Sequence, residues 1–178
     1  ALSAAFVKVF TDYQLKNSEK EAWRLASLVF NVLAVVLSAI CIAGIFLSPL
    51  FVKLITYNYT GYPNHYYPAE KAALATTLMQ IMFPFILLVA LAALAMGVLN
   101  TKGRFGIPAS ASTAFNIASI IFGLGMAFWL AGGEWERSID KISIPSDAAQ
   151  WAIIGMSIGT LIGGAAQLAI QLPSLHKV

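Results

Sequence analysis

The side chains that usually carry out catalysis are sparse in this chain and form no recognisable set. The single cysteine, Cys41, lies in an apolar run, so the chain cannot form an internal disulfide or a thiolate metal site. His65 and His176 have no cysteine or carboxylate cluster beside them, which argues against a metal centre. A glycine-rich phosphate-binding loop is also lacking. We therefore expect no catalytic residues, no metal, no cofactor and no nucleic-acid partner.

Uncharged polar side chains on apolar segments are the remaining candidates for function. Each of them costs free energy in lipid unless it faces a hydrogen-bonding partner or water. We expect Gln80 and Asn116 to line a polar cavity, together with Pro84, because a proline inside a helix leaves a backbone carbonyl without its donor. Hydrogen bonding between helices is the alternative for each polar residue, and simple tolerance of the kink is the alternative for Pro84.

A short basic turn joins two apolar segments near the middle of the chain. We expect Lys102 and Arg104 to contact lipid phosphates or the neighbouring helix end, and Asn100 to cap that end. Phe105 and Pro108 complete this cytoplasmic turn motif.

The composition predicts an integral membrane protein of the all-α class. Hydrophobic residues make up 59% of the chain and charged residues 11%, whereas about a quarter of the residues in a soluble domain are charged. The mean hydropathy is +0.78. Four uncharged stretches exceed the roughly 20 residues that cross a bilayer as a helix. They are 25–52, 72–101, 105–133 and 148–175.

Local signals divide this single transmembrane domain into helices at 1–16, 19–48, 69–101, 106–131 and 147–172. The first is too short to span, and it lacks an initiator methionine and a leader pattern, so we expect the chain to be a fragment of a longer protein. Ser48-Pro49 is expected to close the second helix. Gly155, Gly159 and Gly163 recur at every fourth position, which is typical of close helix packing.

The distribution of lysine and arginine predicts how the helices are oriented. One set of connections, at 16–24, 102–104 and 177, is the richer in positive charge, while the other set carries acidic residues beside its few basic ones. Because basic residues in short loops favour the cytoplasmic side, we expect the first set to face the cytoplasm.

Several of these segments together resemble one transporter family. Met82-Phe83-Pro84-Phe85 and the stretch from Leu99 through Ala109 to Asn116 closely resemble the MurJ/MviN family of lipid II flippases. The segments around Ala5 and Gln171 resemble the ends of that family's second and sixth helices. The resemblance covers almost the whole chain and implies the N-terminal lobe of a fourteen-helix, MurJ/MATE-like transporter, from the end of helix two through helix six. Lys8 and Ser112 stand where the family usually has proline.

This resemblance implies a transporter of the bacterial inner membrane rather than an enzyme. Such a flippase moves lipid II, the undecaprenyl-linked peptidoglycan precursor, from the cytoplasmic to the outer leaflet by alternating access. The expected partners are lipid II, membrane lipids and the remaining helices of the full-length protein. The family's cavity arginines lie on helices one, early two and eight, so the resemblance assigns none of them to a position here.

Two alternatives share the membrane fold. A related exporter of the same MOP superfamily would move polysaccharide-linked lipids or drugs and should lack the turn motif from Asn100 to Pro108. A non-transporting membrane scaffold would use the glycine stripe for assembly and would enclose no wet cavity.

Overall fold

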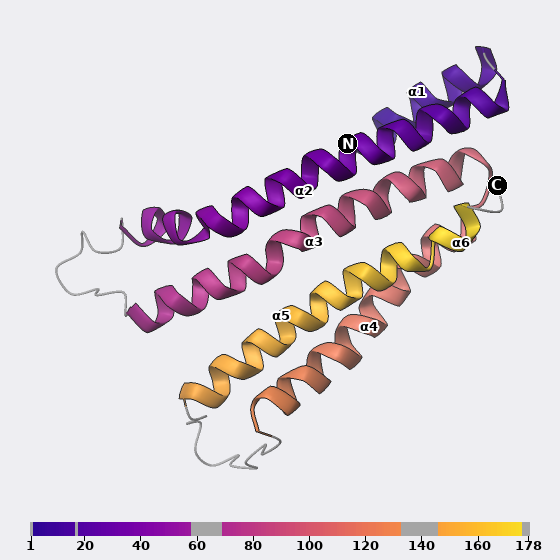
Figure 1. Ribbon diagram of the computed structural model, residues 1–178. Coiled ribbons are helices and arrows are strands. Elements are labelled where there is room, and N and C mark those ends of the chain that lie inside the picture. Colours follow the sequence, from indigo (N-terminus) through magenta and orange to yellow (C-terminus); the bar gives the residue numbers. More distant parts are fainter. Residues whose placement is uncertain (1, 17, 58–68, 133–145, 176–178) are drawn as a thin grey trace.

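The computed structural model describes residues 2–16, 18–57, 69–132 and 146–175, and nearly all of them are helical (Figure 1). The helices are α1 (Leu2–Lys16), α2 (Glu19–Tyr57), α3 (Ala69–Thr101), α4 (Gly106–Leu130), α5 (Ser146–Ala169) and α6 (Leu172–Leu175). The described part of the chain contains no strand. The predicted all-α class is confirmed.

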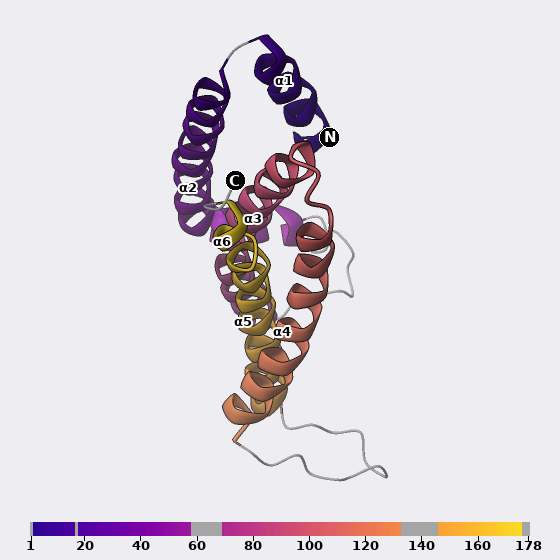
Figure 2. The same cartoon turned by 90° about the vertical axis from the view of Figure 1, so that its right-hand side faces the viewer.

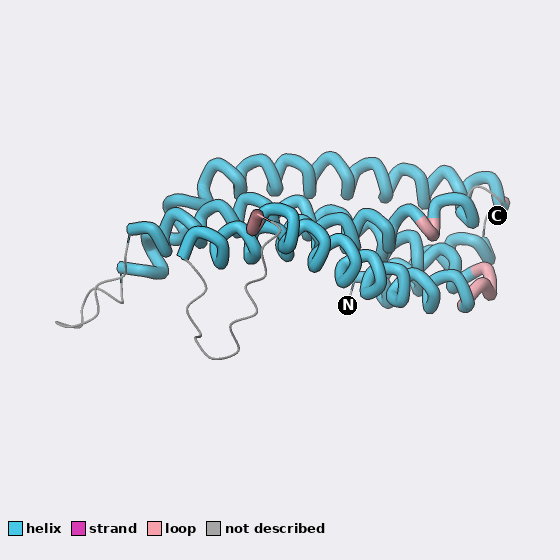
Figure 3. The backbone as a smooth tube through the Cα atoms, turned by 90° about the horizontal axis from the view of Figure 1, so that it is seen from below, coloured by secondary structure: helices cyan, strands magenta, loops and turns pink. Residues whose placement is uncertain are grey.

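Four helices of the described chain are long and apolar enough to cross a membrane. They are Lys20–Thr56, Ala69–Thr101, Gly106–Leu130 and Asp147–Leu175, and the shortest has 25 residues. At a rise of about 1.5 Å per residue, even that helix exceeds the roughly 30 Å of hydrocarbon in a bilayer. Figure 3 shows the long helices side by side along one general direction, and Figure 1 shows that α4 and α5 diverge from α2 and α3 away from the α3–α4 turn.

Helix α3 lies at the centre of the bundle. It contacts each of the other five helices, whereas α4 packs most extensively against α5 (Figures 1 and 2). The buried core accordingly follows the C-terminal half of α3, from Leu91 to Leu99.

The outer faces of α2 and α4 are apolar. Val35 and Phe46 on α2 are 69% and 79% exposed, and Ile121 and Trp129 on α4 are 62% and 71% exposed. A water-soluble protein seldom exposes apolar patches of this extent, because covering them with water is unfavourable. These faces fit a lipid environment.

The prediction that Ser48-Pro49 closes the second helix is wrong, because α2 continues through Pro49 to Tyr57. Proline removes one backbone donor, and here the carbonyl left without it is that of Ile45, four residues earlier. The side-chain amide of Gln80 on α3 donates to this Ile45 oxygen at 3.2 Å. The Ser48 hydroxyl donates to the Gly44 carbonyl at 2.7 Å. The Gln80 amide on α3 therefore replaces the backbone donor that Pro49 lacks, and α2 continues past Pro49 as a helix.

The last predicted helix is also divided differently. Helix α5 ends at Ala169, and a separate short helix, α6, begins at Leu172. The ring of Pro173 would clash with the carbonyl of Ala169 if the helix continued, and Pro173 has no N–H to donate to it. The remaining ends agree with the predicted ones or differ by one residue, which is within the ordinary uncertainty of helix boundaries.

Candidate functional site

The basic turn between α3 and α4 closes as a Schellman motif. The backbone N–H of Arg104 donates to the carbonyl of Leu99 at 3.0 Å, and that of Gly103 donates to Asn100 at 3.1 Å. Gly103 has a φ of 71°, a left-handed conformation that favours glycine. The turn is therefore a defined structure, in which the backbone carbonyl of Asn100 takes part in the helix cap.

The first turn of α4 explains the other motif residues. Phe105 is the residue before the helix, and its carbonyl accepts the N–H of Ala109 at 3.2 Å. Pro108 is buried in the first turn, where its lack of an N–H costs no helical hydrogen bond. The Phe105 side chain is 66% exposed, which suits an interfacial aromatic residue.

Lys102 lies against the start of α2. Its ammonium nitrogen stands 5.7 Å from the centroid of the Trp23 ring, within the range of a cation–π interaction. Beneath this pair, Phe10 of α1, Ala22 and Ala26 of α2 and Val98 of α3 form a buried cluster. Lys102 thus connects the turn to α2, and the buried cluster packs the adjoining end of α3 against α1 and α2.

The predicted cytoplasmic connections within the described residues meet at one end of the bundle (Figure 1). The end of α1, the start of α2, the α3–α4 turn and α6 all lie there. This end, which we call the basic end, carries five cationic side chains, and all except Lys102 are exposed. They are Lys16, Lys20, Arg24, Lys102 and Arg104. Lys177 and both histidines lie outside the described residues.

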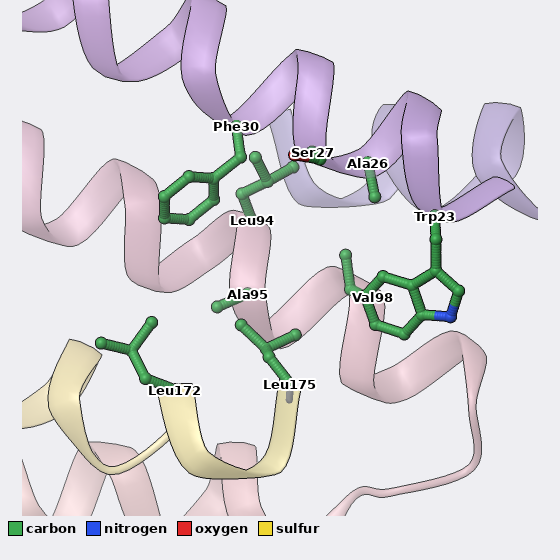
Figure 4. Close-up of a pocket in the computed structure, with 9 residues that line it drawn as sticks. All are labelled: Trp23, Ala26, Ser27, Phe30, Leu94, Ala95, Val98, Leu172 and Leu175. Carbon is green, nitrogen blue, oxygen red and sulfur yellow. The ribbon is translucent and has the colours of Figure 1, made fainter. Parts of the chain in front are cut away.

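A cavity of about 480 Å³ opens between α2, α3 and α6 at the basic end (Figure 4). Apolar side chains form nearly all of its wall, and Ser27 and the indole of Trp23 add the polar groups. The lining residues are Trp23, Ala26, Ser27, Phe30, Leu94, Ala95, Val98, Leu172 and Leu175. Sequence reasoning missed this cavity. The spacing of Trp23, Ser27 and Phe30 places them on one helix face, but nothing in the sequence shows which helices would surround that face.

The structure places Gln80 at the contact between α2 and α3, and Pro84 inside the continuous helix α3 between Phe83, which contacts α2, and Phe85, which contacts α4. Besides the bond from Gln80 to Ile45, the Cys41 thiol donates to the carbonyl of Phe83 at 3.1 Å. The Phe83 ring lies directly over Gly44, where a side chain would leave it no room. The interaction that the structure gives Gln80 is therefore the interhelical hydrogen bond considered as the alternative, and its cavity role stays a prediction.

Asn116 faces a different environment from Gln80. It is exposed near the middle of α4, although the ring of the preceding Phe115 lies 5.8 Å from that of Phe85 on α3. Pro84 and Asn116 are thus at similar levels of the bundle, but Gln80 is engaged with α2 while Asn116 points away from the core. An exposed amide in the middle of an apolar helix favours a wet cavity or a further polar partner.

The stripe formed by Gly155, Gly159 and Gly163 faces α4 at each of its three positions. A Cβ at Gly155 would stand 2.5 Å from the amide nitrogen of Ala127, and one at Gly159 would overlap the backbone of Gly123. A Cβ at Gly163 would lie 2.9 Å from the Phe115 carbonyl oxygen. The backbones of α4 and α5 therefore touch, and only glycine allows this approach.

Among the described residues, no three histidine, cysteine or carboxylate side chains lie close enough to hold a metal ion. Cys41 is buried in α2 with its thiol on the Phe83 carbonyl.

Four helices of bilayer length with apolar outer faces define a multi-pass α-helical membrane protein. Within that class, residues 1–178 match the model of the lipid II flippase MurJ family, and the chain belongs to this family.

Individual relatives agree with the family model. A probable lipid II flippase MurJ of Buchnera aphidicola is 31% identical over 176 residues, covering 99% of this chain and 30% of the relative. A lipid II flippase MurJ of Burkholderia cenocepacia is 29% identical over 178 residues, covering 100% of this chain and 30% of the relative. A probable lipid II flippase MurJ of Bdellovibrio bacteriovorus is 27% identical, covering 99% of this chain and 31% of the relative. The chain therefore spans about 30% of the length of these curated relatives.

Proposed function

We propose that the full-length protein is a lipid II flippase, a transporter that moves the lipid-linked peptidoglycan precursor from the cytoplasmic to the outer leaflet. The observation that carries this proposal is the match to the MurJ family along all 178 residues. By the same resemblance, the chain corresponds to the end of helix two through helix six of the N-terminal lobe.

The charge distribution along this chain indicates which part of such a transporter would bind the anionic headgroup. The lipid II headgroup carries an anionic pyrophosphate, and moving it through hydrocarbon without compensating groups would cost a large free energy. The stretches 25–52, 72–101, 106–130 and 148–175 contain no lysine, arginine, aspartate or glutamate. The four long helices therefore offer no cation to the pyrophosphate in mid-membrane, and Lys8 on α1 is the one cation of the described helices that lies away from the helix ends. We propose that the other helices of the full-length protein supply the remaining cations.

This chain then supplies the rigid framework of one lobe. The glycine contacts fix α4 on α5, and the bonds from Gln80 and Cys41 fix α3 on α2. Helix α3 also packs against α5 and so joins the two pairs. Alternating access by rocking of lobes requires each lobe to move as a unit, and close packing of this kind favours that behaviour.

We propose that the protein lies in the bacterial inner membrane with the basic end in the cytoplasm. The concentration of lysine and arginine at that end supports this orientation. Lys102 and Arg104 would then lie at the level of the lipid phosphates of the cytoplasmic leaflet.

Replacement of the resident flippase tests the proposed function. The full-length protein would be expressed in a bacterium depleted of its own lipid II flippase, and both growth and the amount of lipid II exposed at the outer surface would be measured. We expect both to be restored. Failure of both despite normal membrane insertion would contradict the lipid II assignment and favour an exporter of another lipid-linked sugar.

A further inference from the structure

The cavity at the basic end combines an apolar interior with cations at one end only. Phe30, Leu94 and Leu172 line its deeper part, and Trp23 lies toward the start of α2 (Figure 4). Its volume of about 480 Å³ falls within the roughly 300–1,000 Å³ of typical ligand sites. The shape and chemistry are those of a site for an amphipathic molecule rather than for a soluble polar one.

Two lysines are assigned to the Trp23 end of this cavity, Lys102 by its contact with the Trp23 ring and Lys20 by its spacing along α2. The Lys102 ammonium lies over the Trp23 ring. Lys20 is exposed and stands three residues before Trp23, so it lies on the same face of α2 as Trp23 and Ser27. Of the two nearby glutamates, Glu21 is on another face, because adjacent residues of a helix do not point in the same direction, whereas Glu19 precedes Trp23 by four residues. The two lysines therefore outnumber the one acidic position in this register.

The position of the cavity along the helices corresponds to the boundary between the lipid headgroups and the hydrocarbon. Trp23 and Lys20 belong to the first two turns of α2, and the uncharged stretch begins directly after Arg24. Tryptophan is enriched at this boundary, and basic pockets between helices on the cytoplasmic side suit anionic lipid headgroups.

We propose that this cavity is a binding site for an anionic diacyl phospholipid of the surrounding leaflet. One acyl chain lies between α2, α3 and α6, and the phosphate lies at Lys20 and Lys102. The exposed Ser27 hydroxyl is the polar group available to the ester linkage at the cavity rim. The lipid fills the space between α2, α3 and α6. This proposal does not rest on the proposed flippase function, but it uses the proposed cytoplasmic orientation of the basic end.

Photocrosslinking tests this site without any transport measurement. The full-length protein would be placed in phosphatidylcholine nanodiscs containing phosphatidylglycerol with a diazirine on one acyl chain, and the crosslinked residues would be mapped by mass spectrometry. We expect crosslinks on the cavity-lining residues of α2, α3 and α6. They should be stronger than with the same diazirine on phosphatidylcholine, and excess unlabelled phosphatidylglycerol should compete with them.

Two substitutions separate the cavity from bulk lipid. Ala95 is 1% exposed and lines the cavity, so Ala95→Phe should fill it and remove these crosslinks. Thr113→Phe is the matched control, because Thr113 is exposed on α4, about two turns from the α3–α4 turn, and does not line the cavity. This substitution should leave the crosslinks unchanged. Lys20→Gln alters an exposed side chain that the fold does not need. It should lower the preference for phosphatidylglycerol about five-fold, the factor expected for one basic residue near an anionic surface.

Three outcomes would overturn the proposal. Equal crosslinking of the two lipids, unaffected by Ala95→Phe or by Lys20→Gln, would mean that bulk lipid contacts this surface without a specific binding site. Absence of crosslinks on the cavity lining would mean that another part of the protein covers it. Displacement by undecaprenyl phosphate but not by phosphatidylglycerol would assign the site to a prenyl lipid instead.

Discussion

Replacing Gln80 by leucine should weaken the fold because the carbonyl of Ile45 would lose the donor that the Gln80 side chain provides. Pro49 has no N–H for this oxygen, and the Gln80 amide supplies one at 3.2 Å. An unpaired buried polar group costs about 1–3 kcal/mol, although interhelical hydrogen bonds in membranes average about 0.6 and reach about 1.7 kcal/mol. We therefore expect Gln80→Leu to lower the free energy of unfolding by about 1 kcal/mol.

A double-mutant cycle with Pro49→Ala isolates this effect. Alanine at 49 restores the N–H that donates to Ile45, so Gln80→Leu should then cost close to nothing, with a coupling of about 1 kcal/mol between the two sites. The free energy of unfolding would be measured for the four full-length proteins in bicelles. Thr76→Val is a control, because the Thr76 hydroxyl donates within its own helix to Ala72 at 2.8 Å and should show no coupling to Pro49. Additive effects of Pro49→Ala and Gln80→Leu would refute the argument.

Three further predictions concern the α4–α5 contact and the basic turn. Gly159→Ala should destabilise the protein by about 1–3 kcal/mol through overlap with the α4 backbone, whereas Gly125→Ala, with nothing within 4 Å, should not; thermal unfolding in detergent would compare them. Gly103→Ala should cost about 1–2 kcal/mol because φ is 71°, while Gly106→Ala, at an open position without a positive φ, should be neutral in the same assay. A cysteine in place of Arg104 should react with a membrane-impermeant maleimide only when the reagent reaches the cytoplasmic side, and labelling of intact cells from outside would reverse the proposed orientation.

Much of the fold could be predicted because its determinants are local. Helix α3 has the predicted bounds 69–101, and α4 starts at the predicted residue 106, since the short glycine-containing turn between them marks both ends. The predicted end at residue 172 runs three residues past the end of α5, because the ring of Pro173 conflicts with the carbonyl four residues earlier, at Ala169. Pro49 was misjudged for the opposite reason, because its compensation comes from Gln80, 31 residues further along the chain and on another helix.

The candidate site was less accessible to sequence reasoning. The basic turn could be singled out from its residue types, but the position of Lys102 over Trp23 depends on how α3 packs against α2. The cavity at the basic end is formed by three helices that are distant in the sequence, so no single segment predicts it. Gln80 and Asn116 are both uncharged polar residues within apolar stretches of the sequence. In the structure, however, Gln80 bonds to a neighbouring helix and Asn116 is exposed.

Transport by the purified full-length protein is the most direct test of the central claim, that this chain belongs to a working lipid II flippase. The protein would be reconstituted into liposomes with fluorescent lipid II, and the fraction of headgroups accessible to a membrane-impermeant quencher would be followed over time. The account predicts that lipid II crosses faster than in protein-free liposomes, while a fluorescent phosphatidylcholine does not. Equal rates for lipid II with and without active, correctly folded protein would contradict it.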